Sequence, residues 1–218
     1  MRLTLLEFVR LALKHKSYPF YHYYLKNRKC LDVACGLGEL LERDPINFVG
    51  IELDEKLLAD CKKKGLNVFQ GSCTNLGMFR DESFDAVSCF NIIEHLYPMD
   101  ASKMIDECAR VLKRGGVILI DTPSETYVWD TFSHVKPYPP IAFHKLINNK
   151  LENYIKPSTD DKLTNVTNLT IEKVYYKGLT RTRVTLFLYL VIFNFTSLRN
   201  MFRRPPFCSG YLIVLRKK

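Results

Sequence analysis

Short apolar runs alternate with amphipathic stretches between residues 30 and 122. The apolar runs occupy residues 30–34, 48–52, 66–70, 84–90 and 117–121. Apolar side chains recur at helical spacing between these runs, in residues 38–43, 55–64 and 101–112. This regular alternation predicts parallel strands joined by crossover helices.

The two ends of the chain show further elements. Residues 3–16 predict a helix with interspersed basic residues, and an aromatic cluster follows it. Farther along, residues 141–151 predict a helix, while residues 169–176 and 211–215 predict two strands. The arginine-flanked apolar stretch at 184–195 is shorter than the ~20 residues of a membrane-spanning helix. A buried helix, an interfacial helix and the wall of an apolar pocket remain alternatives for it.

The first predicted strand ends in a turn that favours close approach of a ligand. Residues 30–38 read CLDVACGLG, with Gly36 and Gly38 just before a predicted helix that begins at Glu39. Glycines at such a turn let backbone N–H groups come near a bound molecule. The segment has neither the G-x-G-x-x-G of a dinucleotide site nor the G-K-[ST] of a phosphate loop. Taken alone, it is equally consistent with a tight strand–helix connection.

The ends of the other predicted strands also carry polar residues. Ligands of open parallel sheets bind at the carboxyl ends of the strands. The second strand ends in Glu52, whose carboxylate can accept two hydrogen bonds from a ribose diol, and the fourth runs on into Glu94 and His95. Before the fifth strand, residues 111–116 predict a helix end followed by a glycine turn.

Composition narrows the class of protein. The 218 residues, 47% of them hydrophobic, suffice for one domain with a full core. Seven scattered cysteines without a C-x-x-C pair argue against a disulfide framework or a zinc site and suit a reducing cytosol. Glu7 and Arg10 interrupt the N-terminal apolar run, so no signal peptide is predicted. We therefore expect a cytoplasmic location, with membrane association as an option.

The net charge of +9 is concentrated at the two ends. Residues 1–30 carry seven Lys and Arg against one Glu, and residues 172–218 carry ten against one. Residues 31–171 carry 15 Lys and Arg against 21 Asp and Glu. Basic ends can meet an anionic membrane surface, a nucleic acid or an acidic partner, or can be plain solvated surface. The acidic middle makes a nucleic acid the less favoured partner.

Four ordered segments together resemble the class I S-adenosylmethionine-dependent methyltransferases, and most of all the branch of quinone, lipid and glycan O-methyltransferases. They are LDVACGLGE, FVGIELDEKLLADC, FDAVSCFNIIEHL and LKRGGVILIDTPSE. The resemblance implies an α/β, Rossmann-like fold with a seven-stranded, mostly parallel sheet, its last strand antiparallel, and helices on both faces. We expect a single methyltransferase domain over 1–218, with a helical and aromatic cap at 1–29 and an apolar, basic insertion at 178–209.

The resemblance also implies roles toward S-adenosylmethionine as cofactor. Asp32 would orient its methionine end, and Glu52 would hold the ribose. The turn residues Ala34, Gly36 and Gly38 would let the cofactor lie against the backbone.

Further contacts are implied with the adenine and with the methionine ammonium. Leu53 would pack on the adenine, Ser72 and Cys73 would line its edge, and the backbone near Cys89 would accept from the ammonium. Relatives usually carry an acid where this chain has Ser72, so the charge-assisted bond to the adenine amine is missing and we predict a weaker cofactor affinity. A second departure is Ala34 in place of a turn glycine, which is tolerable if its φ is negative.

Methyl transfer from a sulfonium is an in-line displacement, in which the protein mainly supplies alignment. With a hydroxyl acceptor, a base near the methyl would assist, and the candidates are His95 and His134. Alternatively, His95 and its neighbour Glu94 orient the local helix, and His134 is a surface histidine. The sequence indicates no metal.

The expected function is therefore methyl transfer to a small or lipid- or glycan-linked acceptor, with a hydroxyl favoured, by an enzyme that visits anionic membranes. A tRNA or rRNA methyltransferase is an alternative, which the basic ends suggest and the lack of an N-P-P-Y-like motif disfavours. A non-catalytic subunit that keeps the fold as an interaction platform is another. The sequence does not identify the acceptor, the methylated atom or the oligomeric state.

Overall fold

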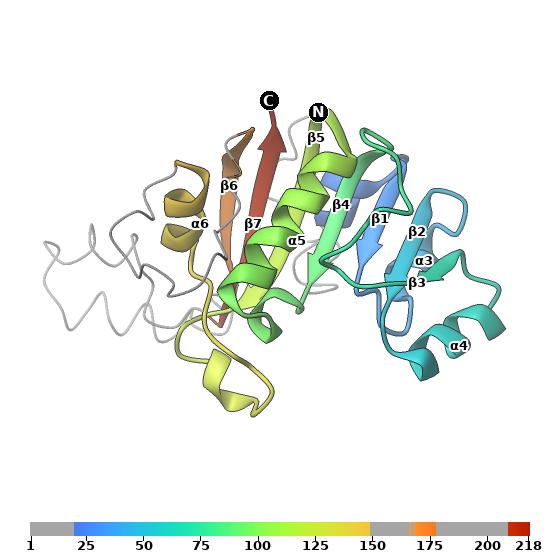
Figure 1. Ribbon diagram of the computed structural model, residues 1–218, viewed down its shortest axis with the longest axis horizontal. Coiled ribbons are helices and arrows are strands. Elements are labelled where there is room, and N and C mark those ends of the chain that lie inside the picture. Colours follow the sequence, from blue (N-terminus) through green and yellow to red (C-terminus); the bar gives the residue numbers. More distant parts are fainter. Residues whose placement is uncertain (1–19, 149–165, 167, 178–208) are drawn as a thin grey trace, which may run out of the picture.

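The computed structural model describes residues 20–148, 166, 168–177 and 209–218. A seven-stranded sheet with the order β3-β2-β1-β4-β5-β7-β6 forms its centre (Figure 1). Its strands are β1 (Cys30–Val33), β2 (Phe48–Glu52), β3 (Val68–Gln70), β4 (Phe84–Phe90), β5 (Leu112–Pro123), β6 (Leu169–Lys177) and β7 (Gly210–Lys217). β1 to β5 pair in parallel, whereas β7 runs antiparallel to both β5 and β6. The expected mostly parallel sheet with an antiparallel last strand is confirmed.

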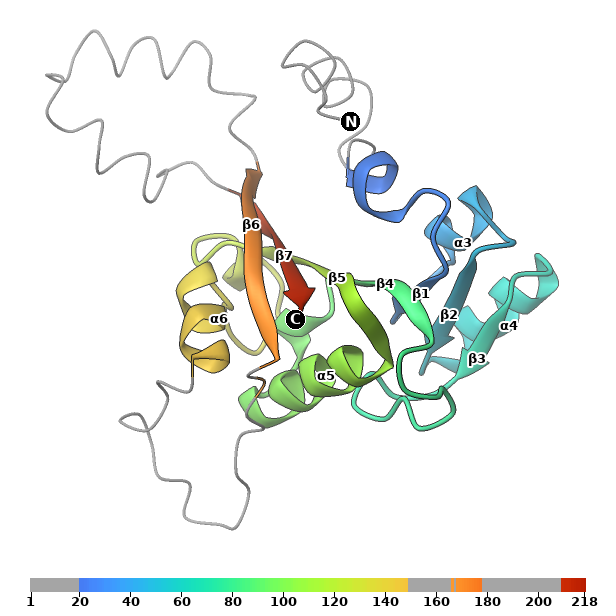
Figure 2. The same ribbon diagram turned by 90° about the horizontal axis from the view of Figure 1, so that it is seen from above.

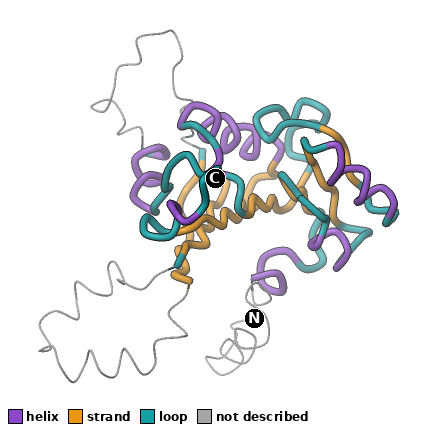
Figure 3. The backbone as a smooth tube through the Cα atoms, turned by 90° about the horizontal axis from the view of Figure 1, so that it is seen from below, coloured by secondary structure: helices purple, strands orange, loops and turns teal. Residues whose placement is uncertain are grey.

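Helices cover both faces of the sheet (Figures 2 and 3). They are α3 (Glu39–Arg43), α4 (Glu55–Lys63), α5 (Pro98–Val111) and α6 (Pro140–Ile147), with three short turns η1 (Tyr21–Leu25), η2 (Ile93–His95) and η3 (Val128–Asp130). Each predicted helix or strand within the described residues forms, with shifts of a few residues at its ends. The predicted helix 3–16, the apolar stretch 184–195 and nearly all of the insertion 178–209 lie outside the described residues. Within the described part, no helix is long and apolar enough to cross a bilayer.

Two apolar cores, one on each face, explain why the strands read as nearly unbroken apolar runs. Met104 of α5 and Phe143 of α6 belong to one core, and Leu41 of α3 and Leu58 of α4 belong to the other. Successive strand residues alternate between them, as Ile213 and Val214 of β7 do. The described part of the predicted aromatic cap joins the second core.

The predicted glycine turn after α5 takes a different form. Residues 113–116 are part of β5 and bulge outward, because Phe84 pairs with Leu112 and Ala86 already pairs with Val117. Gly115 supplies the positive φ of +74° that this bulge requires. β5 therefore begins earlier than the apolar pattern indicated.

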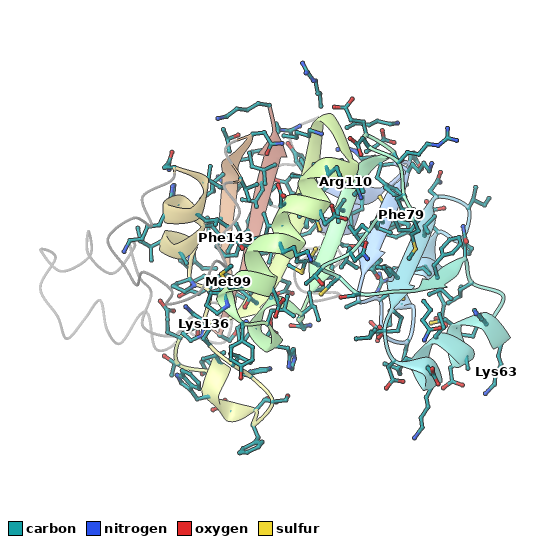
Figure 4. All side chains as sticks on the ribbon, in the orientation of Figure 1. Lys63, Phe79, Met99, Arg110, Lys136 and Phe143 are labelled. Atoms are coloured by element: carbon teal, nitrogen blue, oxygen red, sulfur yellow. The ribbon has the colours of Figure 1, made fainter. Side chains whose placement is uncertain are left out.

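An arginine clamp fixes the segment between β3 and β4. Arg110 on α5 donates to the backbone oxygens of Leu76 and Phe79, both at 3.0 Å, and Figure 4 shows Arg110 beside Phe79. Its neighbour Glu107 accepts from the Leu76 N–H at 2.7 Å. These bonds hold the segment that contains Ser72 against the body of the domain.

The turn before α3 places Gly38 in a crowded position. Its φ is +78°, and an added Cβ would lie 2.5 Å from Leu66 Cδ1 and 3.1 Å from Cys61 Sγ. Gly65 has a similar φ of +72° but open space around it. A comparison of alanine substitutions at Gly38 and Gly65 therefore separates the effect of backbone strain from the effect of side-chain crowding.

We predict that Gly38→Ala lowers the free energy of unfolding more than Gly65→Ala does. Both variants carry the left-handed strain of about 1–2 kcal/mol. Gly38→Ala adds an overpacking cost of about 1–3 kcal/mol. Urea unfolding of both variants checks this, and equal losses in the two would contradict it.

Candidate active site

The carboxyl ends of β1, β2, β4 and β5 lie at one edge of the sheet, the lower edge in Figure 1. The sequence predicted Asp32 and Glu52 at two of these ends, and the structure places both there. The loop that follows β5 projects at the same edge (Figure 1). This edge therefore brings together the side chains expected to act on a ligand.

Asp32 is a buried carboxyl group with one side-chain hydrogen bond. Only 5% of its surface is exposed, and its Oδ1 accepts from the Ser88 hydroxyl of β4 at 2.6 Å. Burial raises the pKa of Asp32 to about 7; the Ser88 hydrogen bond opposes the rise, and the charge of Glu52 adds to it. A cationic group placed against Asp32 would therefore favour its ionised form near neutral pH.

Glu52 binds three backbone N–H groups. Its Oε2 accepts from Gly36 at 2.8 Å, and its Oε1 accepts from Leu53 at 2.8 Å and from Asp54 at 3.0 Å. A carboxylate offers about four acceptor positions, so one position on Oε2 stays available to a ligand hydroxyl. The same carboxylate thus ties the glycine turn to the end of β2.

The backbone of the turn between β1 and α3 differs from the expectation for Ala34. Ala34 has a positive φ of +57°, not the negative φ under which an alanine would be unstrained. The left-handed conformation costs a residue with a Cβ about 1–2 kcal/mol. Bonds around the turn compensate, since Cys35 N donates to Ile51 O at 3.0 Å and Gly36 N reaches Glu52.

The four residues predicted near the adenine and the ammonium lie in different surroundings. Leu53 is 66% exposed, and Ser72 is part of a local turn in which its Oγ lies 2.9 Å from the Thr74 hydroxyl. Cys73 is half-buried against the core. Cys89 is fully buried, with its thiol 3.7 Å from Cys108, so that only its backbone could face a ligand.

A second group of side chains joins η2 to the loop after β5. The rings of His95 and His134 lie with their centroids 4.7 Å apart. The Nδ1 of His95 lies 3.2 Å from the Ser133 oxygen, and the Nδ1 of His134 lies 2.5 Å from the Val128 oxygen. The two histidines that the sequence offered as separate candidates are therefore neighbours.

A pocket of about 230 Å³ lies beside these histidines. Its lining residues come from the ends of β5, β6 and β7, from the segment that follows β4, and from the loops before α6 and β7: Asn91, Glu94, Asp121, Thr122, Pro123, His134, Lys177, Ser209 and Gly210. Two buried polar atoms in this lining, Glu94 Oε2 and Thr122 Oγ1, have no hydrogen-bond partner. Buried polar atoms normally have partners, so this lining is suited to a ligand that hydrogen-bonds.

Sequence reasoning did not select several groups of this pocket. Asp121 ends the predicted run 117–121 and lies two residues before the end of β5, so the strand-end rule that found Glu52 could have found it. Lys177, whose Nζ lies 2.6 Å from Asp121 Oδ1, comes from β6 and meets Asp121 only through sheet pairing. Thr122 carried no signal, because a threonine in a strand is ordinary.

Glu94 and His134 of this lining, together with the neighbouring His95, could hold a metal ion. One ligand atom from each of Glu94, His95 and His134 lies within 4.8 Å of the other two. Two imidazoles and a carboxylate are ligands for divalent transition metals.

The chain shares sequence with known methyltransferases. Residues 31–120 match the family model described as a methyltransferase domain. A ubiquinone biosynthesis O-methyltransferase of Methylococcus capsulatus is 34% identical over 110 residues, which are 46% of each protein. A tRNA (carboxymethyluridine(34)-5-O)-methyltransferase of Arabidopsis thaliana is 35% identical over 92 residues, 41% of this chain and 22% of that protein. The chain spans about half the length of the first curated relatives it matches, and less of others.

Solved structures share the fold. A SAM-dependent methyltransferase from Archaeoglobus fulgidus superposes with a TM-score of 0.63 at 20% identity, covering 96% of this chain and 94% of that one. At this identity the likeness concerns the fold alone. The matched domain at 31–120, the strand order and the similar curated proteins together support a class I S-adenosylmethionine-dependent methyltransferase.

Proposed function

We propose that this protein transfers the methyl group of S-adenosylmethionine to a hydroxyl group of a small or lipid-linked acceptor. The observation that carries the proposal is the pairing of two sites on one sheet edge. The turn with Asp32 and Glu52 lies at the ends of β1 and β2, and the pocket with Glu94 and Thr122 lies at the ends of β4 and β5. A donor and an acceptor bound at these sites would be neighbours.

The residues at the turn suit the cofactor. Glu52 has one acceptor position left for a ribose hydroxyl, and Leu53 offers an exposed apolar surface to the adenine. Space above Gly36 is open, since an added Cβ there would meet nothing within 4 Å. Asp32 would receive the positively charged methionine end, and the backbone after Cys89 would accept from the ammonium. Ser72 and Cys73 would lie along the adenine edge.

The transfer itself needs alignment more than chemical activation by the protein. When bound, S-adenosylmethionine supplies an activated methyl group on a good leaving group. Holding two reactants in line can contribute roughly 7–11 kcal/mol of the barrier. In the pocket, Thr122 and Glu94 would orient the acceptor by hydrogen bonds. His134 lines the pocket and contacts His95, so these two stay the predicted catalytic residues.

An acceptor with an apolar part is supported by the loop after β5. This loop exposes Tyr127, Trp129 and Phe132 close in sequence to His134. Aromatic side chains with one wet and one apolar end favour bilayer interfaces and amphipathic ligands. One of the relatives carries ubiquinone biosynthesis in its name, in line with an acceptor of this kind.

A tRNA acceptor is the second candidate. Its support is the similarity to a tRNA methyltransferase and the basic charge at the two ends of the chain. Methylation of purified tRNA, with no transfer to quinol or phenol acceptors, would favour it over the first candidate.

We predict that the protein binds S-adenosylmethionine and that Glu52→Gln weakens this binding about ten- to a hundredfold. The amide cannot accept at both ends, so a charged hydrogen bond worth about 1.5–3 kcal/mol is lost. Calorimetry measures the affinity, and Glu55→Gln, an exposed acid three residues farther on, is the control. A wild-type protein that does not bind the cofactor would overturn the proposed function.

We predict that cofactor affinity rises about tenfold between pH 5.5 and 7.5. The pKa of Asp32, about 7 in the free protein, should fall when a cation binds beside it, so binding releases a proton in this range. Calorimetry in buffers with different ionisation enthalpies measures that proton. Asp32→Asn should abolish the release, and an affinity that does not vary with pH in the wild type would count against this role.

We predict that vesicles of phosphatidylcholine and phosphatidylglycerol shift the emission of Trp129, the single tryptophan of the chain, to shorter wavelength. The aromatic loop would enter the less polar interface. Phe132→Ser should reduce the shift. Ile46→Ser, which removes an apolar side chain that is 92% exposed in the connection between α3 and β2, should not. If the emission of Trp129 stays unchanged at low salt, the proposed binding to anionic membranes is contradicted.

A further inference from the structure

We propose that Glu94, His95 and His134 bind one divalent transition-metal ion at the wall of the acceptor pocket. Glu94 and His95 belong to η2, which begins three residues after the end of β4, and His134 comes from the loop between β5 and α6. Their ligand atoms lie within 4.8 Å of one another. Binding of the ion is independent of the proposed function, and only its part in the transfer rests on that function.

Both histidines make a backbone contact through Nδ1. A backbone carbonyl can only accept, so the contacts of His95 with Ser133 and of His134 with Val128 place the ring proton on Nδ1. In the neutral imidazole, the lone pair is then on Nε2. Metal-binding histidines usually donate their other ring N–H to a carbonyl or carboxylate in this way.

Glu94 supplies the second, independent observation. Its side chain is buried, only 1% of the residue being exposed, and its Oε2 has no hydrogen-bond partner. Leaving a buried carboxylate oxygen unpaired is costly, and a cation would remove that cost. The loop with His134 is also tied to this residue, because Val135 N donates to the Glu94 backbone oxygen at 2.8 Å.

The surroundings tolerate a cation. Lys177 is the basic side chain that lines the same pocket, and Asp121 neutralises it at 2.6 Å. Donor atoms around one zinc ion lie about 3–4 Å apart, given bonds of about 2.0–2.2 Å. Closing the present spread to such distances requires a movement of about 1 Å.

Two imidazoles and one carboxylate select Zn²⁺, Co²⁺, Mn²⁺ or Fe²⁺ over Mg²⁺ and Ca²⁺. Three protein ligands leave coordination positions open toward the pocket. An acceptor hydroxyl at such a position would lose its proton more readily, because a bound metal lowers the pKa of a coordinated hydroxyl.

Cobalt titration of the full chain, stripped with a chelator, tests the site. We expect one Co²⁺ per chain, with the visible absorption of nitrogen and oxygen ligands. Glu94→Gln and His134→Gln should each weaken binding at least about tenfold, because each removes a ligand. His144→Gln, an exposed histidine of α6, is the control and should bind as the wild type does.

An intense thiolate-to-cobalt band would assign the ion to cysteines and overturn the proposal, as would unchanged binding in His134→Gln. His134 lies in a loop, so this variant keeps the test valid even if Glu94→Gln fails to fold. Calorimetry with S-adenosylmethionine on the same samples separates the two proposals. If cobalt binds at this site but S-adenosylmethionine does not bind, only the proposed methyl transfer is contradicted. If S-adenosylmethionine binds but cobalt does not, only the proposed metal site is contradicted.

Discussion

The candidate site depends on a single carboxylate that binds backbone N–H groups from two sides. Glu52 accepts from Gly36 in the turn after β1 and from Leu53 and Asp54 at the start of the next connection. The turn includes Ala34 with a positive φ, which is unfavourable without such support. These bonds fix the shape of the turn, and a turn of fixed shape would lower the ordering cost of binding a ligand there.

β4 connects the two halves of the site. Its Ser88 hydrogen-bonds Asp32 of β1, and the residues just beyond its end, Asn91 and Glu94, line the pocket. The Tyr138 hydroxyl donates to the Leu96 oxygen at 2.8 Å, which ties the loop after β5 to the same region. A displacement of β4 would therefore disturb both halves together, and the central position of this strand in the sheet opposes such a displacement.

Much of this arrangement could be predicted from the sequence, because strand ends in a parallel sheet share an edge. Apolar periodicity located the strands, and this rule then placed Asp32 and Glu52. The strand-end rule could not give the side-chain direction of Cys89. A strand that is buried on both faces lacks the alternation of polar and apolar residues that distinguishes one face from the other. Nor could the rule give the positive φ of Ala34, which tertiary bonds impose.

The pocket was harder to predict, because its groups meet only through long-range pairing. Lys177 reaches Asp121 across β7, and His134 meets His95 although 38 residues separate them in sequence. Neither pair leaves a local pattern. His95 was found because it follows the fourth predicted strand, and His134 was found as a histidine of a loop. Their contact comes from the path of that loop.

The junction between β6 and β7 has an evolutionary consequence. β6 ends at Lys177 and β7 begins at Gly210, and the N–H of Ser209 donates to the Lys177 oxygen at 3.0 Å. This hydrogen bond holds the end of β6 next to the start of β7, so the pairing of the two strands does not limit the length of the connection between them. The entropy cost of closing such a connection grows only with the logarithm of its length. The residues between these two positions could therefore change in length and sequence, while Lys177 and Ser209, which line the pocket, keep their places.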